Sequence, residues 1–486
     1  MSGYYVENFG CRATQADGAA LEHQFEEYGL TRATAPAQAA LVVLNTCTVT
    51  AAADQDARAA IRRLQRQNPE AKIVVTGCYA QRAPEEVAAL PGVSFVIGNS
   101  HKHQLAKIAL EKTPIVEETN SDFIPLARLT ENRKLRTESA IFVSDNFAHT
   151  ELLAAPVFDA ANERTRPNLK IQDGCDNRCS FCVIPYVRGH SRSLEPDRII
   201  REVNGLVKAG YREVVISGIN LGRWGKDLAS RTSGLNLDPG ADRPGLRSEA
   251  RQTPCLVDLI RKILEETILE KLRISSIEPM DWSDELILLL AKSPRIAKHA
   301  HVPMQSGSDT VLRRMHRRYR PWHYQDKITK IRAAMPTAAI GADVMVGFPG
   351  ETDAEFEATR RMIEDLPFTY LHVFTYSPRP GTAGARMPGQ VPVLVARQRN
   401  RILRELAAEK KLAFMRSLVG NEIQAITLRR ESAGARATQS EFTEALTDNY
   451  LKLRLHGHHE PNRWWRARIE DVVDGALVGT LNSTAE

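Results

Sequence analysis

Apolar and polar positions alternate in two different ways along the first part of the chain. Residues 4–6, 41–44 and 73–76 are short apolar runs rich in β-branched or aromatic side chains, which is typical of buried strands. Helical periodicity at 18–28, 54–67 and 84–90 lies between and after these runs. The alternation predicts an open, Rossmann-like α/β domain over residues 1–110.

A second series of strands and helices is predicted over residues 166–404. Its six expected strands are 168–172, 213–217, 272–276, 299–304, 338–346 and 370–375. Six such βα units predict a partial TIM barrel, (βα)6, and the active site of such a barrel lies at the carboxyl ends of its strands. Residues 111–165, which are polar and irregular, are expected to be a connector, and the Gly/Pro/Ser-rich stretch 230–253 an insertion without catalytic part.

The pattern changes again near the carboxyl end. A long helical stretch at 393–418 is followed by strand-like runs at 422–428, 441–446, 450–455 and 464–469. In the third run, leucines alternate with Lys452 and Arg454, so one face is buried and the other carries cations. We expect a small, OB-like β-barrel over 416–486, a type of domain that often grips nucleic acid.

Charge and hydropathy narrow the possible environments. The 486 residues include 65 Lys+Arg and 59 Asp+Glu, so net charge permits a nucleic-acid partner without requiring one. The chain has no stretch typical of a signal peptide and no apolar run near the length of about 20 residues that spans a bilayer. The expected location is the cytoplasm, without a membrane partner and with reduced thiols.

The most informative motif is the cysteine loop at 171–182. Cys175, Cys179 and Cys182 have the spacing Cys-x-x-x-Cys-x-x-Cys. Three thiolates hold three irons of a four-iron cluster and leave the fourth iron open, whereas electron-transfer clusters are normally closed by four cysteines. S-adenosylmethionine (SAM) can occupy that open iron and be cleaved to a radical. A structural zinc site would need a fourth ligand, and no partner pair lies near.

Three further cysteines predict a second site. Cys11, Cys47 and Cys78 are far apart in sequence, but each comes at or just after the end of a predicted strand. Loops after parallel strands gather along one edge of a sheet, so these thiols can converge on a second cluster with one open iron. The alternative is that they are three buried structural cysteines. Cys255 has no companion and is expected to be a bystander.

Several separated strings resemble the radical-SAM methylthiotransferase family. They are residues 45–50, 76–81, 170–182 with 184–189, and 301–309. The resemblance implies an N-terminal domain with an auxiliary cluster, a central radical-SAM domain and a C-terminal TRAM domain that binds RNA. Thr14 stands where family members commonly carry asparagine.

Three details are similar to one branch of this family, which acts on N6-threonylcarbamoyladenosine beside the tRNA anticodon. These are Tyr79 in the string 78–81, the lead-in 172–175 to the cysteine loop, and the string 217–222. The resemblance implies two 4Fe-4S clusters, SAM, and methylthiolation of carbon 2 of that adenosine at position 37 of the anticodon loop. It also implies an electron donor such as flavodoxin or ferredoxin.

Strand ends provide the candidate cofactor residues. Apart from the cluster ligands, no catalytic side chain is expected, because the radical chemistry belongs to the cofactor. Glycines and polar residues at strand ends are also ordinary turn residues, so each position has a structural alternative. The candidate SAM contacts are Phe181, Ser217, Gly218, Asn220, Ser276, Glu278 and Gln305.

Basic and aromatic residues provide the candidate RNA contacts. The densest basic run is 313–320, and the C-terminal strands carry cations next to tryptophan. A solvated helix end and core packing of a tryptophan are the alternatives. The candidate RNA-binding residues are Arg317, Arg318, Lys452, Arg454, Trp464, Arg466 and Arg468.

The sequence is also compatible with two other functions. A methylthiotransferase acting on isopentenyladenosine in tRNA or on a ribosomal protein would have the same fold and clusters. A non-enzymatic iron–sulfur protein that binds RNA as a redox sensor would also use clusters, but a radical-SAM loop without SAM cleavage has no evident purpose in it.

Overall fold

The computed structural model describes residues 3–111, 139–148, 165–228, 254–429 and 442–481. The chain divides into two compact units, which are described separately. The first contains Met1–Ala155 and Val183–His190, and the second contains Pro156–Cys182 and Ser191–Glu486. The predicted insertion at 230–253 and residues 112–138 and 149–164 of the predicted connector lie outside the described residues. No helix in the described ranges is long and apolar enough to cross a membrane.

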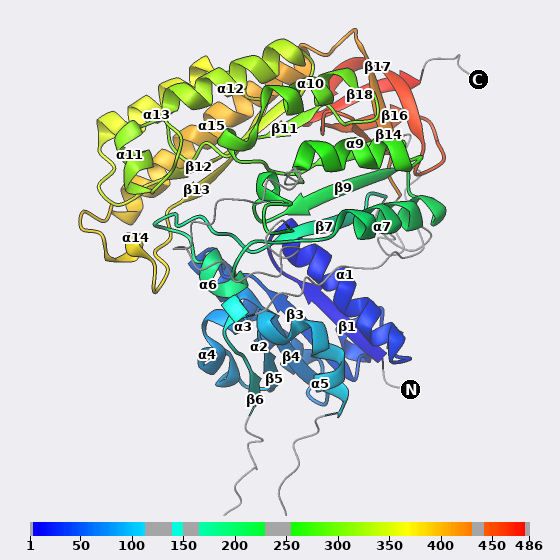
Figure 1. The fold of residues 1–486 in the computed structure, drawn as a ribbon, viewed down its shortest axis with the longest axis vertical. Helices are drawn as coiled ribbons and strands as arrows, with labels where there is room; N and C mark the ends of the chain where they lie inside the picture. The colour runs from blue at the N-terminus through cyan, green and yellow to red at the C-terminus, as the bar shows by residue number, and fades with distance from the viewer. Residues whose placement is uncertain (1–2, 112–138, 149–164, 229–253, 430–441, 482–486) are drawn as a thin grey trace, which may run out of the picture. The chain divides into compact units, whose positions relative to one another are not determined.

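The first unit is built on a six-stranded parallel sheet (Figure 1). The strand order is β2-β1-β3-β4-β5-β6, and each neighbouring pair is parallel. The strands are β1 (Gly3–Asn8), β2 (Thr31–Arg32), β3 (Leu41–Thr46), β4 (Lys72–Gly77), β5 (Val93–Ile97) and β6 (Ala140–Phe142). The helices are α1 (Arg12–Glu27), α2 (Ala51–Gln67), α3 (Cys78–Arg82), α4 (Pro84–Ala88), α5 (Leu105–Glu111) and α6 (Ile184–Arg188).

Both faces of this sheet are covered. On one face Val42, Leu44 and Val75 pack against residues of α2, α3 and α4. On the other, Val43 and Val74 pack against residues of α1 and α5. Because both faces are buried, the central strands β3 and β4 carry unbroken apolar runs at 41–44 and 73–75, as is typical of parallel sheets. The expected open α/β domain is confirmed.

The sheet is larger than the sequence pattern indicates. β5 and β6 are not predicted, and β6 comes from the segment that we expected to be an irregular connector. Ala140 pairs with Phe95 and Phe142 with Ile97, so β6 closes the β5 edge of the sheet. A three-residue strand carries no readable alternation, and its conformation depends on this long-range pairing.

The second unit contains the predicted six strands in sequential order. They are β7 (Asn168–Asp173), β9 (Glu213–Gly218), β10 (Lys271–Ile274), β11 (His299–His301), β12 (Ala339–Val346) and β13 (Tyr370–Thr375). Two sheets, β10-β9-β7-β8 and β11-β12-β13, are joined by a bridge between Ser276 and His301. The short β8 (Arg192–Ser193) adds antiparallel to β7. The result is the expected partial (βα)6 barrel.

Helices follow these strands and cover the outside of the partial barrel (Figure 1). Their buried faces are apolar, as in α9, where Leu256, Leu259 and Ile263 are all buried. The helices are α7 (Pro196–Lys208), α9 (Leu256–Glu266), α10 (Asp284–Lys292), α11 (Asp309–Arg314), α12 (Pro321–Ala334), α13 (Asp353–Asp365), α14 (Ala383–Arg386) and α15 (Val393–Arg416).

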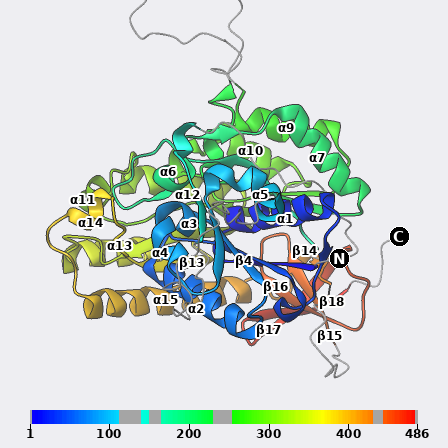
Figure 2. The same ribbon diagram turned by 90° about the horizontal axis from the view of Figure 1, so that it is seen from below.

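A closed five-stranded barrel follows α15, and its strands are labelled in Figure 2. The order is β14-β15-β16-β18-β17, with strands β14 (Glu422–Thr427), β15 (Phe442–Thr447), β16 (Lys452–His456), β17 (Trp464–Val473) and β18 (Ala476–Leu481). β18 is not predicted by the sequence pattern, yet its pairing with β16 and β17 closes the barrel. The alternating leucines of β16 point into the core, as expected.

The small barrel is anchored to the partial barrel by buried cations. The fully buried Arg273 on β10 donates from Nε to Glu213 at 2.5 Å and from Nη1 to the carbonyl of Asp448 at 2.9 Å. Lys271 Nζ donates to Gln424 at 2.8 Å and lies 5.0 Å from the ring centre of Trp464. These contacts hold the C-terminal barrel against the first half of the partial barrel.

Candidate active site and cluster-binding cysteines

The three cysteines of the first unit follow three adjacent strands. Cys11 is the N-cap of α1 after β1, Cys47 follows β3 directly, and Cys78 is the first residue of α3 after β4. Because β1, β3 and β4 are neighbours in a parallel sheet, their carboxyl ends lie side by side. The three thiols therefore come from one edge of the sheet, as the sequence predicts.

Close backbone approach holds this edge together. A Cβ added to Gly10 would lie 2.5 Å from the Cβ of Cys47, so only glycine brings the Cys11 loop this close to Cys47. The Cys11 thiol lies 3.6 Å from the hydroxyl of Thr14, which is buried and occupies the position where the family commonly has asparagine. Asn99 donates to the Cys78 sulfur at 3.6 Å.

The thiol of Cys47 is held in its neutral form when it has no iron. Burial, followed by the neighbouring Cys78 and Cys11, raises the pKa of Cys47 to about 12. Metal coordination requires the thiolate, so binding of iron would release this proton.

A buried ion cluster lies behind these cysteines. Asp17 accepts from Lys102 Nζ at 3.0 Å and from Arg188 Nη2 at 3.1 Å, and Lys102 also donates to Asn45 at 3.1 Å. All four side chains are buried. The positive charge of Arg188 acts on Cys47 and favours its thiolate. The sequence pattern does not indicate this cluster, because its members come from four separate segments.

The radical-SAM loop of the second unit is held by its own hydrogen bonds. The amide of Gln172 donates to the carbonyls of Asp173 and Gly174 at 3.0 and 2.8 Å, and its oxygen accepts from the backbone of Asn220 at 2.7 Å. Ser180 donates to the carbonyl of Arg314 at 2.7 Å. Gln172 is therefore a positioning residue, whereas the sequence alone indicates it only as part of a string typical of one family branch.

Two side chains contact the thiols of this loop. Asn220 Nδ2 lies 3.6 Å from Cys175 Sγ, and Arg317 Nη1 lies 3.3 Å from Cys179 Sγ. Burial raises the pKa of Cys175, and the hydrogen bonds from Asn177 and Asn220 oppose this effect. A positive or N–H donor near sulfur stabilises the thiolate form that iron needs.

The candidate SAM residues lie on the rim of the partial barrel. Ser217 and Gly218 end β9, and a Cβ on Gly218 would lie 2.8 Å from the side-chain oxygen of Gln172. Ser276 bridges to β11, and Gln305 has a left-handed backbone with φ 62°. Phe181 packs against Phe348 with ring centres 6.5 Å apart.

A pocket opens beside Cys179. In the wall of this pocket, Glu278 forms an ion pair with Arg317. The guanidinium of Arg317 lies over the ring of Tyr319, 4.9 Å from the ring centre. The lining residues are Asn177, Arg178, Cys179, Arg223, Glu278, Met280, Asp281, His316, Arg317, Arg318 and Tyr319. The pocket therefore joins the cluster loop with three candidate residues, Glu278, Arg317 and Arg318.

Arg317 differs from its predicted place on an RNA-binding surface. Its side chain is 5% exposed and contacts both Glu278 and Cys179, whereas Arg318 beside it is exposed. The backbone turns at His316, where φ is 57°, and this turn directs Arg317 inward. The sequence of the basic run does not indicate this turn, so it does not show that Arg317 is buried.

The donor set of both triads fits four-iron clusters. Each triad supplies three free thiols, which as thiolates can hold three irons and leave the fourth open. N–H donors contact sulfur in both triads, from Asn99 to Cys78 in the first and from Asn220 and Arg317 in the second.

The candidate RNA contacts of the small barrel differ in exposure. Lys452, Arg466 and Arg468 are exposed, whereas Arg454 is partly buried and paired with Glu444 at 3.6 Å. Trp464 is partly buried against Lys271, as the packing alternative predicts. The exposed cations lie on β16 and β17, two strands of the closed barrel.

Comparison with known families agrees with this division. Residues 3–98 match the uncharacterized protein family UPF0004, and residues 169–363 match the radical SAM superfamily. A solved radical S-adenosylmethionine methyltransferase from Kitasatospora setae covers 79% of this chain and 77% of its own, at 14% identity and a TM-score of 0.47.

Full-length relatives give a sharper result. Threonylcarbamoyladenosine tRNA methylthiotransferase MtaB of Bacillus subtilis is 35% identical over 94% of this chain and 91% of its own length. The protein of the same name from Aquifex aeolicus is 32% identical over 95% and 99%. A tRNA-2-methylthio-N(6)-dimethylallyladenosine synthase from Parafrankia is 32% identical over 98% and 88%. The chain belongs to the radical-SAM methylthiotransferase family.

Proposed function

We propose that this protein adds a methylthio group to carbon 2 of N6-threonylcarbamoyladenosine at position 37 of tRNA. The observation that carries the proposal is the pair of separate cysteine triads, one at the carboxyl ends of three neighbouring parallel strands and the other in the loop that follows β7. As a member of its family, the protein is an enzyme that uses 4Fe-4S clusters and SAM. Relatives named for this substrate, with 31 to 35% identity over most of the chain, support the choice of adenosine.

The two triads support two different tasks. Cys175, Cys179 and Cys182 would hold the cluster that supplies an electron for SAM cleavage, and Cys11, Cys47 and Cys78 would hold the cluster that supplies sulfur. Since the two sets share no ligand, the tasks are separable by mutation. The chain's own residues bind and orient: Asn220 and Arg317 contact the thiols of the central loop.

The C-terminal barrel supports a tRNA partner. Small β-barrels with exposed cations bind nucleic acid through its phosphates. Lys452, Arg466 and Arg468 provide such cations, and we assign this barrel the role of a TRAM domain that grips tRNA. The target base must leave its stack in the anticodon loop to reach the partial barrel. A flavodoxin or ferredoxin would supply the electron, and the reaction belongs in the cytoplasm.

The second candidate is methylthiolation of isopentenyladenosine. One observation favours it: relatives named for dimethylallyladenosine match this chain almost as well, at 29 and 32% identity. Methylthiolation of a ribosomal protein and a redox sensor without enzymatic activity have no such support.

The deciding experiment offers both adenosines to one preparation. Reconstituted enzyme, SAM and a reductant are incubated with tRNA that carries threonylcarbamoyladenosine or isopentenyladenosine, and the digested nucleosides are analysed by mass spectrometry. We expect the 2-methylthio product only from threonylcarbamoyladenosine. Conversion of isopentenyladenosine alone would replace the proposed substrate while leaving the family unchanged.

A further inference from the structure

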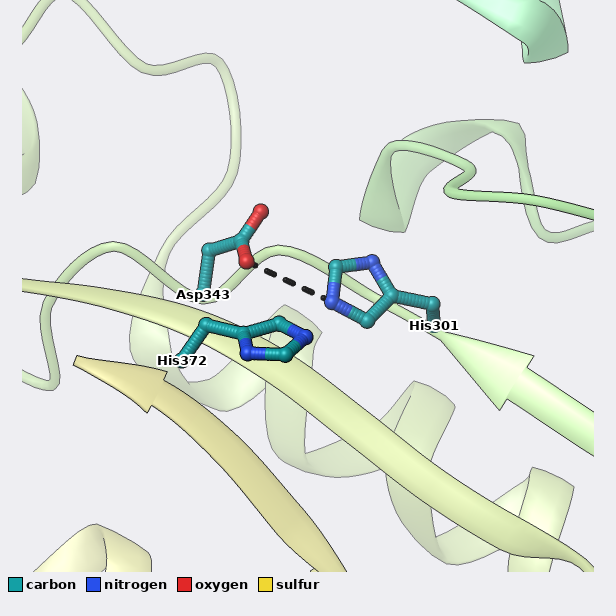
Figure 3. A group of neighbouring side chains, drawn as sticks. All are labelled: His301, Asp343 and His372. Atoms are coloured by element: carbon teal, nitrogen blue, oxygen red, sulfur yellow. Dashed lines mark ion pairs between the residues drawn. The ribbon is translucent and has the colours of Figure 1, made fainter. Parts of the chain in front are cut away.

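A polar group on the inner face of the partial barrel has no role in the function described above. His301 ends β11, Asp343 lies in β12 and His372 lies in β13. Their ligating atoms lie within 4.8 Å of one another, and His301 Nε2 is 3.4 Å from the carboxylate of Asp343 (Figure 3). We call these three residues the floor triad.

Strand alternation shows which way the floor triad faces. In β12 Ala342 and Val344 are fully buried, and Asp343 and Met345 point to the opposite face. Met345 and Phe181, the aromatic of the cysteine loop, pack against the same buried cluster, which includes Phe348. Asp343 is two residues away on the same face, which is about 7 Å along a strand. The floor triad therefore lies one side-chain layer deeper than the expected SAM site.

Aromatic side chains pack against the floor triad. The ring of Tyr370 stacks with His301 at 5.9 Å and 20°, and its hydroxyl lies 2.7 Å from Nε2 of His299. It occupies the space beside Gly341, where an added Cβ would lie 2.0 Å from the ring. Tyr450 of the small barrel packs against Tyr370 from the next layer. The imidazole of His301 is thus held in one orientation.

The floor triad offers polar side-chain atoms to a ligand. His301 is 9% exposed, and its Nε2 has no hydrogen-bond partner beyond the 3.4 Å contact with Asp343. Asp343 is partly exposed and His372 is exposed, so both can reach a bound molecule. A carboxylate accepts from N–H and O–H groups, and imidazoles donate to oxygen. The floor triad therefore suits a ligand group that carries both hydrogen-bond donors and hydrogen-bond acceptors.

We propose that His301, Asp343 and His372 form the subsite for the threonylcarbamoyl group of the target adenosine. This inference rests on the proposed function. The threonylcarbamoyl group offers amide N–H, hydroxyl and carboxylate, which match both kinds of group in the floor triad. A dimethylallyl group offers only C–H and would give the polar atoms of His301 and Asp343 no hydrogen bond from the substrate. Sites built for hydrogen bonding reject analogues that lack the bonding groups far more strongly than apolar pockets reject small size differences.

The test replaces His372, whose side chain is exposed and whose loss leaves the core intact. His372→Phe removes the imidazole nitrogens, His372→Gln keeps a donor and an acceptor, and His323→Ala on α12 is the matched exposed control. Each reconstituted holoenzyme is assayed for kcat/KM on tRNA with threonylcarbamoyladenosine. Binding is measured separately with anticodon stem-loops that carry this nucleoside or plain adenosine.

We expect His372→Phe to lower kcat/KM at least about tenfold and to lose the preference for the modified stem-loop. His372→Gln should retain activity within about threefold of wild type, and His323→Ala should equal wild type. Iron content and 5′-deoxyadenosine formation without tRNA should be unchanged in all variants. Undiminished activity and stem-loop preference in His372→Phe would overturn the subsite.

Two further outcomes are distinguishable. If wild type itself leaves threonylcarbamoyladenosine unmodified, the proposed function fails, and the wild-type assay alone shows it. Two imidazoles and a carboxylate also suit a divalent transition-metal ion. Metal analysis that finds one equivalent of zinc or manganese in wild type but none in His372→Phe would overturn the subsite in favour of a metal site.

Discussion

Arg317 belongs to the densest basic run of the chain, yet its guanidinium is buried between an acid and a thiol. A buried charge persists only when it is paired and hydrogen-bonded. Glu278 provides the pair, and Cys179 and Tyr319 complete the surroundings. The side chain can therefore tune the cluster loop, which an exposed phosphate-binding arginine could not do.

Replacing Arg317 by methionine should shift the reduction potential of the central cluster to more negative values by on the order of 50 mV. The reduced cluster carries more negative charge, and the variant loses both a positive charge and an N–H donor to sulfur. Potentiometric titration followed by electron paramagnetic resonance measures the shift. The exposed neighbour provides the control, since Arg318→Met should leave the potential unchanged. A shift of equal size in both variants would contradict a specific role for Arg317.

Single cysteine variants should divide the iron content and the two activities. Wild type is expected to hold about eight irons, and Cys175→Ala or Cys47→Ala should each lose about four of them. Cys175→Ala should also lose SAM cleavage, whereas Cys47→Ala should keep it but lose sulfur insertion. Iron analysis and chromatography of 5′-deoxyadenosine and modified nucleosides check both points. Full methylthiolation by Cys47→Ala would reduce the first triad to a structural role.

At the scale of elements, the start of α13 shows how a helix is fixed next to the reactive rim. Thr352 accepts from the backbone of Glu355 at 3.2 Å, and Glu355 accepts from the backbone of Thr352 at 2.8 Å, which is a capping box. Arg314 and Thr310 also donate to Glu355. The cap ties α11 to α13 across the turn that follows β12.

Thr352→Ala should lower the free energy of unfolding by about 1 kcal/mol, because it removes one half of the capping box. Urea unfolding of the cluster-free protein, followed by circular dichroism, measures this change. Thr329→Ala within α12 is a useful comparison, because this threonine is exposed like Thr352 but does not stand at the start of its helix. Equal losses at both positions would argue against the cap as the cause.

Glu355 should also give the protein a pH-dependent stability. Burial alone would raise the pKa of this carboxyl, but hydrogen bonds from Thr310, Thr352 and Arg314 outweigh it and lower the pKa to about 2. The usual value is 4.5, so the stabilisation is complete above that pH and is lost as pH falls toward 2. Unfolding of wild type and Glu355→Gln should differ most near neutral pH and converge in acid. A constant difference would contradict this assignment.

For the whole molecule, the docking of the small barrel decides how RNA binding should be tested. Deleting everything after residue 418 would expose Arg273 and Lys271, whose partners are Asp448, Thr447 and Gln424. Removing the partners of a buried cation lowers the stability of the fold. A truncated chain would therefore lose stability for reasons unrelated to tRNA binding. Point substitutions of exposed cations on the barrel avoid this problem.

Lys452→Glu, Arg466→Glu and Arg468→Glu should each weaken tRNA binding and reduce its salt dependence. Each lost phosphate contact should lower the slope of log K against log salt by about 0.7 to 0.9. Filter binding between low and moderate salt measures the slope. Arg361→Glu on α13, where the arginine is 72% exposed, is the matched control and should leave the slope unchanged. An equal effect of the control would mean that only net charge matters.

The local sequence pattern by itself determined many secondary-structure elements and the two cysteine motifs. The strands that precede Cys11, Cys47 and Cys78, the cysteine loop and the order of the six barrel strands can be read from hydrophobic periodicity, because each depends on a few consecutive residues. Parallel strands then bring their carboxyl ends to one edge, which is why the convergence of the cysteines is also predictable.

Tertiary structure alone decided the contacts between distant residues. The pairing of β6 with β5, the salt bridge of Asp17 with Arg188 and the gathering of His301, Asp343 and His372 join segments that are distant in sequence, up to 171 residues apart for Asp17 and Arg188. Arg317 likewise turns inward because Glu278 and Cys179 lie beside it. Periodicity reports which face of an element is buried, but the partner on that face is chosen by packing of the whole chain.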